Sequence, residues 1–150
     1  MELVDLIEPR DVLVDCAVAS KAELLRVLAG MASERTGVDS NAILGLLVNR
    51  ERLGSTGMGN GVAIPHANAP ELMTPLVLLV RLTHPIDFEA IDDMPVDIVF
   101  MALSPAQRGA SHLNILACIA RSARSEPWLN AVRQTPSSAA LHKLLAGTTN

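Results

Sequence analysis

A glycine-rich turn that leads into a proline–histidine pair is the part of this sequence best suited to chemistry. The segment runs Gly57-Met58-Gly59-Asn60-Gly61-Val62-Ala63-Ile64-Pro65-His66. Glycine lacks a Cβ and tolerates positive φ, so its backbone amides can come close to a bound group. Residues 62–64 have the apolar character of a short buried strand, and the fixed φ of Pro65 presents His66 at a defined angle after it. The pattern predicts one imidazole facing an anionic group.

The order of elements separates this turn from nucleotide-binding loops. A dinucleotide fingerprint or a P-loop requires a strand before the glycines and a helix after them. Here a helical pattern precedes the glycines and a strand pattern follows, and there is no Gly-Lys-Ser/Thr triplet. We therefore expect no nucleotide at this turn.

The remaining histidines and cysteines do not form a metal-binding pattern. The four histidines lack the spacing of a zinc site, and Cys16 and Cys118 form neither a CxxC pair nor a disulfide framework. His84, which precedes Pro85, is predicted to lie in a loop, and His142 on the surface of a short helix. We expect no metal, nucleotide or organic cofactor at the site.

Composition narrows the class of partner. Only 2% of the 150 residues are aromatic and the formal net charge is -4, which argues against a nucleic-acid-binding role. The apolar runs at 76–80 and 98–103 are too short to span a bilayer. The acidic N-terminus has no secretory signal pattern, so we expect a cytoplasmic protein without stable membrane insertion.

Hydrophobic patterning predicts a single α/β domain over residues 1–150. Ser20 and Glu23 have the spacing of a capping box at the start of a helix that ends before Gly37. Ser40 is the predicted cap of a second helix. Later helices are expected at about 110–123, 127–134 and 137–145, and strands at 12–14, 61–64, 76–82 and 97–103.

The two longest strand patterns also predict how the sheet is covered. Residues 76–82 and 97–103 are apolar at successive positions instead of alternating positions. Such runs are typical of strands buried on both faces. The expected architecture is therefore a central sheet with helices on both sides.

The stretch from Arg50 to Arg121 resembles the phosphotransferase-system IIA domains of the fructose/mannitol type, also called EIIA type 2. The likeness rests on three motifs, namely Asn49-Arg50-Glu51-Arg52, the glycine turn with Val-Ala-Ile-Pro-His, and Ser111-His112-Leu113-Asn114-Ile115-Leu116. Residues 85–100 resemble more specifically the nitrogen-regulatory branch, the IIA-Ntr proteins. One departure follows His66, where Ala67-Asn68 stands in place of the glycine and basic residue of most relatives.

The resemblance implies a mixed central sheet flanked by helices and a defined activity. His66 would accept a phosphoryl group from a small phosphocarrier protein of the HPr/NPr kind, in a relay fed by phosphoenolpyruvate. Arg50 and His112 would line the same site. The partner that follows in the relay would be a regulated target protein or a IIB domain.

Elementary chemistry gives each of these residues a role. Histidine supplies an unprotonated nitrogen nucleophile near neutral pH, and the loose transition state is stabilised by positioning and by preorganised donors. Arg50 offers a planar fork suited to phosphate. His112 is predicted in the first turn of a helix, whose positive end favours an anion. Further candidate donors to the phosphoryl oxygens are the amides of Gly57, Gly59 and Gly61 and the hydroxyls of Thr56 and Ser55.

Two functions share this predicted site. In the first, the phosphorylation state of His66 regulates target proteins, as in a nitrogen phosphotransferase system. In the second, the protein is a sugar-transport component that passes phosphate to a fructose/mannitol-type IIB domain. A third possibility, a binding module with a degenerate site, is disfavoured because Arg50, His66 and His112 are all present.

Overall fold

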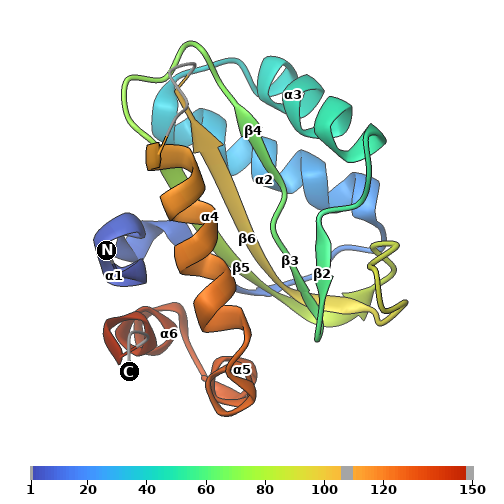
Figure 1. Cartoon of the computed structure of the whole chain (residues 1–150), viewed down its shortest axis with the longest axis vertical. Helices are drawn as coiled ribbons and strands as arrows, with labels where there is room; N and C mark the ends of the chain where they lie inside the picture. Colours follow the sequence, from blue (N-terminus) through green and yellow to red (C-terminus); the bar gives the residue numbers. More distant parts are fainter. Residues whose placement is uncertain (1, 106–109, 148–150) are drawn as a thin grey trace.

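A mixed sheet between two layers of helices forms the centre of the computed structural model, which describes residues 2–105 and 110–147 (Figure 1). The strands are β1 (Val12–Cys16), β2 (Gly57–Gly59), β3 (Val62–Ala63), β4 (His66–Asn68), β5 (Leu76–Ile86) and β6 (Val96–Ser104). The helices are α1 (Leu3–Leu6), α2 (Lys21–Thr36), α3 (Ser40–Arg52), α4 (Ala110–Ala123), α5 (Glu126–Gln134) and α6 (Ser138–Leu144), with short 3-10 turns at Pro9–Asp11 and Leu145–Gly147.

Strand β6 organises the sheet. The order is β1-β5-β6-β3-β2, with β5 antiparallel to β6 and β1 parallel to β5. Both β3 and β4 pair in parallel with β6, one after the other, so that Val62 lies opposite Ile98 and His66 lies opposite Ala102. Among the described strands β4 pairs with β6 alone, which leaves His66 at an open edge.

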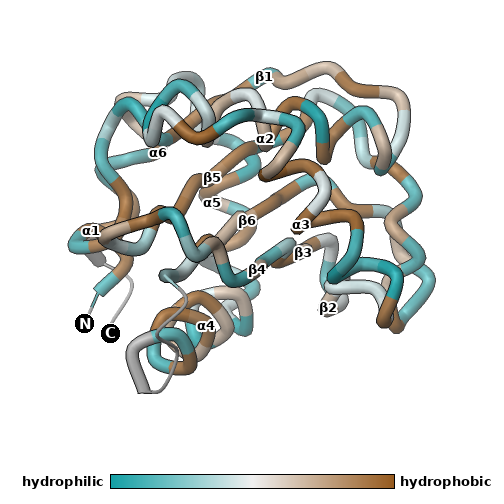
Figure 2. The backbone as a smooth tube through the Cα atoms, turned by 90° about the horizontal axis from the view of Figure 1, so that it is seen from above, coloured by the Kyte–Doolittle hydropathy of each residue, from teal (hydrophilic) through white to brown (hydrophobic). Residues whose placement is uncertain are grey.

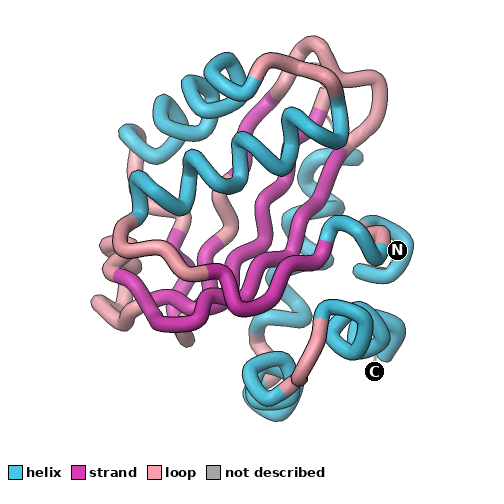
Figure 3. The backbone as a smooth tube through the Cα atoms, turned by 180° about the vertical axis from the view of Figure 1, so that it is seen from behind, coloured by secondary structure: helices cyan, strands magenta, loops and turns pink. Residues whose placement is uncertain are grey.

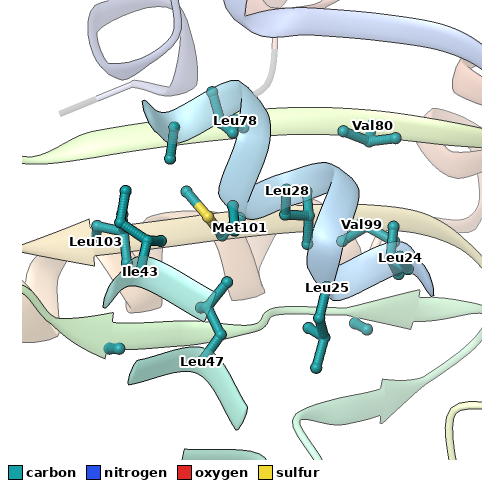
Figure 4. Packing of buried hydrophobic residues seen from close by; sticks show 14 of the residues in the cluster. Leu24, Leu25, Leu28, Ile43, Leu47, Leu78, Val80, Val99, Met101 and Leu103 are labelled. Carbon is teal, nitrogen blue, oxygen red and sulfur yellow. The ribbon is translucent and has the colours of Figure 1, made fainter. Parts of the chain in front are cut away.

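Both faces of the long strands are buried, as the continuous apolar runs predicted. Side chains of β5 and β6 alternate between two cores. One core packs under α2 and α3, as Figure 3 shows from behind the sheet and Figure 4 in close-up, and includes Leu78, Val80, Val99, Met101 and Leu103. The other lies under α1, α4, α5 and α6 and includes Val77, Leu79, Ile98, Phe100 and Ala102. The strands consequently form an apolar layer between the helices (Figure 2). No helix among the described residues is long and apolar enough to cross a membrane.

The caps of α2 and α3 are set by local side chains. The Ser20 hydroxyl accepts a hydrogen bond from the Glu23 amide, and α2 stops at Gly37, whose φ of 77° is left-handed. For α3 the predicted cap is wrong by one residue. Asp39 is the N-cap, because its carboxylate accepts from the Ala42 amide at 3.1 Å while Ser40 is already helical.

Tertiary pairing accounts for the elements that the patterns did not predict. Strands β2 and β4 have three residues each, too few for a local pattern, and they exist through hydrogen bonds to β3 and β6. Strand β5 continues to Ile86, so His84 is an exposed strand residue instead of the predicted loop residue. His142 is half-buried instead of superficial, with its Nε2 2.8 Å from the Ile7 carbonyl oxygen.

The corrected cap of α3 gives a stability prediction. Asp39→Ala removes an acceptor for a helix amide and should lower the free energy of unfolding by about 1 kcal/mol. Ser40→Ala is the matched control and should change it by less than about 0.5 kcal/mol. Urea denaturation of the two variants measures both values, and a larger loss for Ser40→Ala would show that Ser40 is the cap after all.

Candidate functional site

The backbone around Pro65 fixes the orientation and tautomer of His66. Pro65 has no amide hydrogen to donate, but its carbonyl accepts from the Ala102 amide at 3.0 Å and so keeps the chain beside β6. The His66 Nδ1 lies 2.7 Å from the Ile64 carbonyl oxygen. Because a carbonyl only accepts, Nδ1 of the neutral ring carries the hydrogen and Nε2 carries the lone pair. His66 thus has a nucleophilic nitrogen at Nε2.

The surroundings of His66 also favour its neutral form. Burial lowers the pKa of His66 below its ordinary value, and electrostatic interactions with Arg50 and His112 lower it further. The hydrogen bond to Ile64 and the negative charge of Glu51 act in the opposite direction without reversing the shift. The imidazole is therefore unprotonated near neutral pH, as a nucleophile must be.

His112 reaches the site from α4, which belongs to the helix layer formed by α1, α4, α5 and α6. It is the third residue of α4, and its ring centroid lies 5.8 Å from that of His66, with the planes tilted by 49°. The His112 Nδ1 is 2.6 Å from the Ser104 hydroxyl at the end of β6. This contact orients the second ring toward the site.

Arg50 comes from the other side of the sheet. It lies in the last turn of α3, and its Nη1 donates to the Gly54 carbonyl at 2.9 Å. One pocket is lined by residues from α3, β4 and α4: Leu46, Asn49, Arg50, Leu53, His66, Ala67, Asn68 and His112. The three residues predicted to act together, Arg50, His66 and His112, therefore line one pocket.

The structure does not place the glycine turn at this pocket. The chain runs from Gly61 through β3 to His66, and five residues of extended chain span roughly 16 Å. Gly57 lies against Ala90, and Gly61 lines a different hollow beside Asp97 and Arg133. The described pocket lining includes none of these glycines, which belong to the β2–β3 hairpin, and the expected role of their amides as phosphoryl donors stays a prediction. Gly59 likewise lies against Asp92.

The hydroxyls of Ser55 and Thr56 are also occupied elsewhere. The Ser55 hydroxyl donates to the Phe88 carbonyl at 2.7 Å. The Thr56 hydroxyl donates to the Glu51 carboxylate. Neither side chain lines the pocket that contains His66.

Sequence reasoning missed the groups that hold the site residues in place. These are the Ile64 carbonyl, the Ser104 hydroxyl and the Glu51 carboxylate. Only Glu51 left a signal, as part of the Asn-Arg-Glu-Arg motif. Asp97, at the start of β6, pairs with Arg133, whose Nε lies 2.9 Å from its carboxylate. Within the described part of the chain, no group of three or more His, Cys, Asp or Glu is placed to hold a metal ion.

Comparison with known proteins identifies the class to which this fold and site belong. Residues 5–147 match the family model described as "Phosphoenolpyruvate-dependent sugar phosphotransferase system, EIIA 2". The chain belongs to this family, and membership makes it a phosphotransfer component of such a system.

Individual relatives place the chain beside the nitrogen-regulatory members. A nitrogen regulatory protein of Bradyrhizobium diazoefficiens is 42% identical, over 97% of this chain and 95% of that protein. A fructose-specific EIIA component of Haloferax volcanii is 34% identical, over 97% and 90%. The crystal structure of IIA-Ntr from Neisseria meningitidis superimposes with a TM-score of 0.90 at 25% identity, covering 95% of this chain and 98% of that one. The fold and the branch resemblance inferred from the motifs are confirmed.

The pKa of His66 gives the first prediction for the site. Its pKa should lie below the ordinary histidine value of 6.5, and Arg50→Gln should raise it, because a nearby positive charge is removed. The measurement is an NMR titration of the imidazole ring. Arg52→Gln, a change of the same charge on an exposed neighbour in α3, is the control and should shift the pKa less. A parent value at or above 6.5 would contradict the burial argument.

The backbone conformation of Gly61 in the hairpin gives a second prediction. Gly61 has φ +81°, and an added Cβ would collide with the Arg133 guanidinium. Gly61→Ala should therefore lower the free energy of unfolding by at least about 1 kcal/mol. Gly30→Ala, where a Cβ meets no atom within 4 Å, is the control and should not destabilise. Urea denaturation measures both, and an undisturbed Gly61→Ala protein would show that the hairpin does not need this glycine.

Proposed function

We propose that this protein is a regulatory phosphocarrier in which His66 accepts a phosphoryl group from a small HPr/NPr-type protein, in a relay fed by phosphoenolpyruvate. The observation that carries the proposal is the His66 ring, whose Nδ1 is 2.7 Å from the Ile64 carbonyl and whose Nε2 is left as the nucleophile. The regulatory role is supported by the likeness to proteins named as nitrogen regulatory proteins.

The transfer step balances without a proton transfer at His66. The Nε2 lone pair attacks phosphorus while the bond from phosphorus to the donor nitrogen breaks, and that bond's electron pair returns to the donor imidazole. The phosphorylated His66 ring gains positive charge, which the Nδ1–H bond to the Ile64 carbonyl stabilises. The reaction therefore needs the neutral ring that burial favours.

Arg50 and His112 are suited to the charge on the phosphoryl oxygens. The Arg50 guanidinium supplies donors that match phosphate geometry, and Arg50 lines the same pocket as His66. His112 adds a ring nitrogen from the first turn of α4, where the helix dipole favours an anion. Because the phosphoryl charge is spread in the loose transition state, both act by electrostatic stabilisation.

The rim of the pocket suits a protein donor. Leu53 lines the pocket and is 85% exposed, and Leu113, which follows His112 in α4, is 66% exposed, although most leucines of the chain are buried. Exposed apolar side chains around a polar centre are typical of protein-binding surfaces. Asn68, which replaces the basic residue of most relatives, lies in the same pocket and reduces the positive charge offered to a partner.

Sugar transport is the second candidate function. It is favoured by the 34% identity to a protein named as a fructose-specific EIIA component. In that case phosphorylated His66 would pass its phosphoryl group to a IIB domain. Chemistry at His66 is the same in both cases, so the acceptor decides between them.

Phosphorylation of His66 is tested by intact-mass analysis after incubation with phosphoenolpyruvate, enzyme I and the small phosphocarrier. The parent should gain one acid-labile phosphoryl group and His66→Ala should gain none. Arg50→Gln and His112→Ala should slow the gain by about 10²-fold, the loss typical of a transition-state donor. His84→Ala, which changes an exposed histidine of β5, is the control. A parent that gains nothing from the donor of its own organism would refute the proposal.

The acceptor is tested on the phosphorylated protein in a separate experiment. A IIB domain of the fructose/mannitol type is added, and loss of the phosphoryl group from His66 is followed by mass. Retention of the group supports the regulatory role. Loss within seconds supports transport.

A further inference from the structure

A nearly buried carboxylate adjoins the site without taking part in the chemistry described above. The Glu51 side chain, at the end of α3, is 6% exposed. It accepts a hydrogen bond from the Thr56 amide at 3.1 Å and another from the Thr56 hydroxyl. Lys21, from the start of α2, lies 2.9 Å away and neutralises it. All these partners belong to the turn after α3 or to the neighbouring helix.

From Thr56 the contacts continue to the nucleophile. The Thr56 carbonyl accepts from the Ile64 amide at 3.0 Å. The Ile64 carbonyl in turn lies 2.7 Å from His66 Nδ1. One residue, Ile64, therefore connects the Glu51–Thr56 pair to the ring: its amide bonds to Thr56 and its carbonyl sets the tautomer of His66.

The same turn also holds Arg50. The Leu53 amide donates to the Arg50 carbonyl and the Gly54 amide donates to the Glu51 carbonyl, each at 3.1 Å. The Gly54 carbonyl then accepts from Arg50 Nη1 at 2.9 Å. The Glu51 side chain connects the last turn of α3 to Thr56. The position of the Gly54 carbonyl, which lies between them in the chain, therefore depends on Glu51.

We propose that Glu51 is a positioning residue for phosphoryl transfer, which holds His66 through Thr56 and Ile64 and holds Arg50 through the turn at Gly54. The inference rests on the proposed function of His66. Glu51 acts through these groups and lies outside the pocket that contains His66. We call the Lys21–Glu51–Thr56 contacts the clasp.

The chemistry of the clasp requires a carboxylate. Two donors of Thr56 and the ammonium of Lys21 point at Glu51, and a carboxylate offers two oxygens that only accept. Glutamine would offer one acceptor oxygen and turn an amide NH₂ group toward the remaining donors. A buried charge of this kind is tolerated because Lys21 neutralises it. The charge also acts on the nucleophile, since Glu51 opposes the lowering of the His66 pKa.

Four variants test the clasp against matched controls. Glu51→Gln removes the charge and one acceptor, and Thr56→Val removes the hydroxyl. Thr56→Ser restores the hydroxyl for comparison with Thr56→Val. Glu89→Gln is the matched control, because Glu89 is a second carboxylate near Lys21, at 3.8 Å, but is 77% exposed and has no described contact with Thr56. Thermal unfolding confirms that each variant is folded before it is assayed.

The kinetic readout separates positioning from donor binding. With the small phosphocarrier as donor, Glu51→Gln and Thr56→Val should lower the transfer rate at saturating donor by about 10- to 100-fold, the loss expected for a misplaced reacting group. The half-saturating donor concentration should stay constant, because Glu51 is nearly buried. Glu89→Gln should transfer at the parent rate, and Thr56→Ser faster than Thr56→Val.

NMR of the His66 ring gives a readout that does not depend on the donor. The ¹⁵N shifts should report the Nδ1–H tautomer in the parent and a mixture of tautomers in Glu51→Gln and Thr56→Val. Glu51→Gln should also lower the His66 pKa, because the negative charge that raises it is removed. Parent-like rates, tautomer and pKa in folded Glu51→Gln and Thr56→Val would overturn the inference. If the parent itself accepts no phosphate, the proposed function fails, and the tautomer and pKa still decide whether the clasp exists.

Discussion

The course of residues 62–68 along one edge of β6 is the constraint on which the site depends. The chain pairs with β6 at Val62 and again at His66. Between them Pro65 cannot donate to a ladder, and the Ile64 carbonyl is left to face the His66 ring. A break of two residues in an otherwise regular pairing thus produces both the position of the nucleophile and its tautomer. The edge position places His66 in the pocket that Arg50 and His112 also line.

Because helices cover both faces of the sheet, two of them can supply the other residues of the site, Arg50 from α3 and His112 from α4. The α3 helix packs on one core and α4 on the other. The two helices lie in opposite layers (Figures 1 and 2), and Arg50 from α3 and His112 from α4 line one pocket with His66. Apolar side chains hold these helices on the sheet. The polar side chains of the site lie in the pocket and are not part of either core.

Charges around the site are arranged to keep one ring neutral beside several ionic groups. Burial and electrostatic interactions with Arg50 and His112 lower the His66 pKa, and Glu51 moderates the effect. Glu51 is itself neutralised by Lys21 from another helix. Farther away, the Asp97–Arg133 pair anchors the β2–β3 hairpin at its glycine end, where Arg133 also donates to the Asn60 carbonyl at 2.7 Å. The surroundings of His66 and the hairpin anchor thus use separate ionic pairs, Lys21–Glu51 and Asp97–Arg133.

The sequence by itself determined the fold class, the double-sided burial of β5 and β6, the longer helices and the prediction that Arg50, His66 and His112 share a site. These features follow from periodicity, from strong local signals such as Ser20 and Gly37, and from motifs in the chain. Only the tertiary structure decided that the glycines lie away from His66 and that Thr56 bonds to Glu51. It also decided that β2 and β4 exist as strands. The physical reason is that a three-residue strand, a tautomer or a buried carboxylate is set by partners distant in the chain, and no local pattern records which partner a backbone carbonyl will meet.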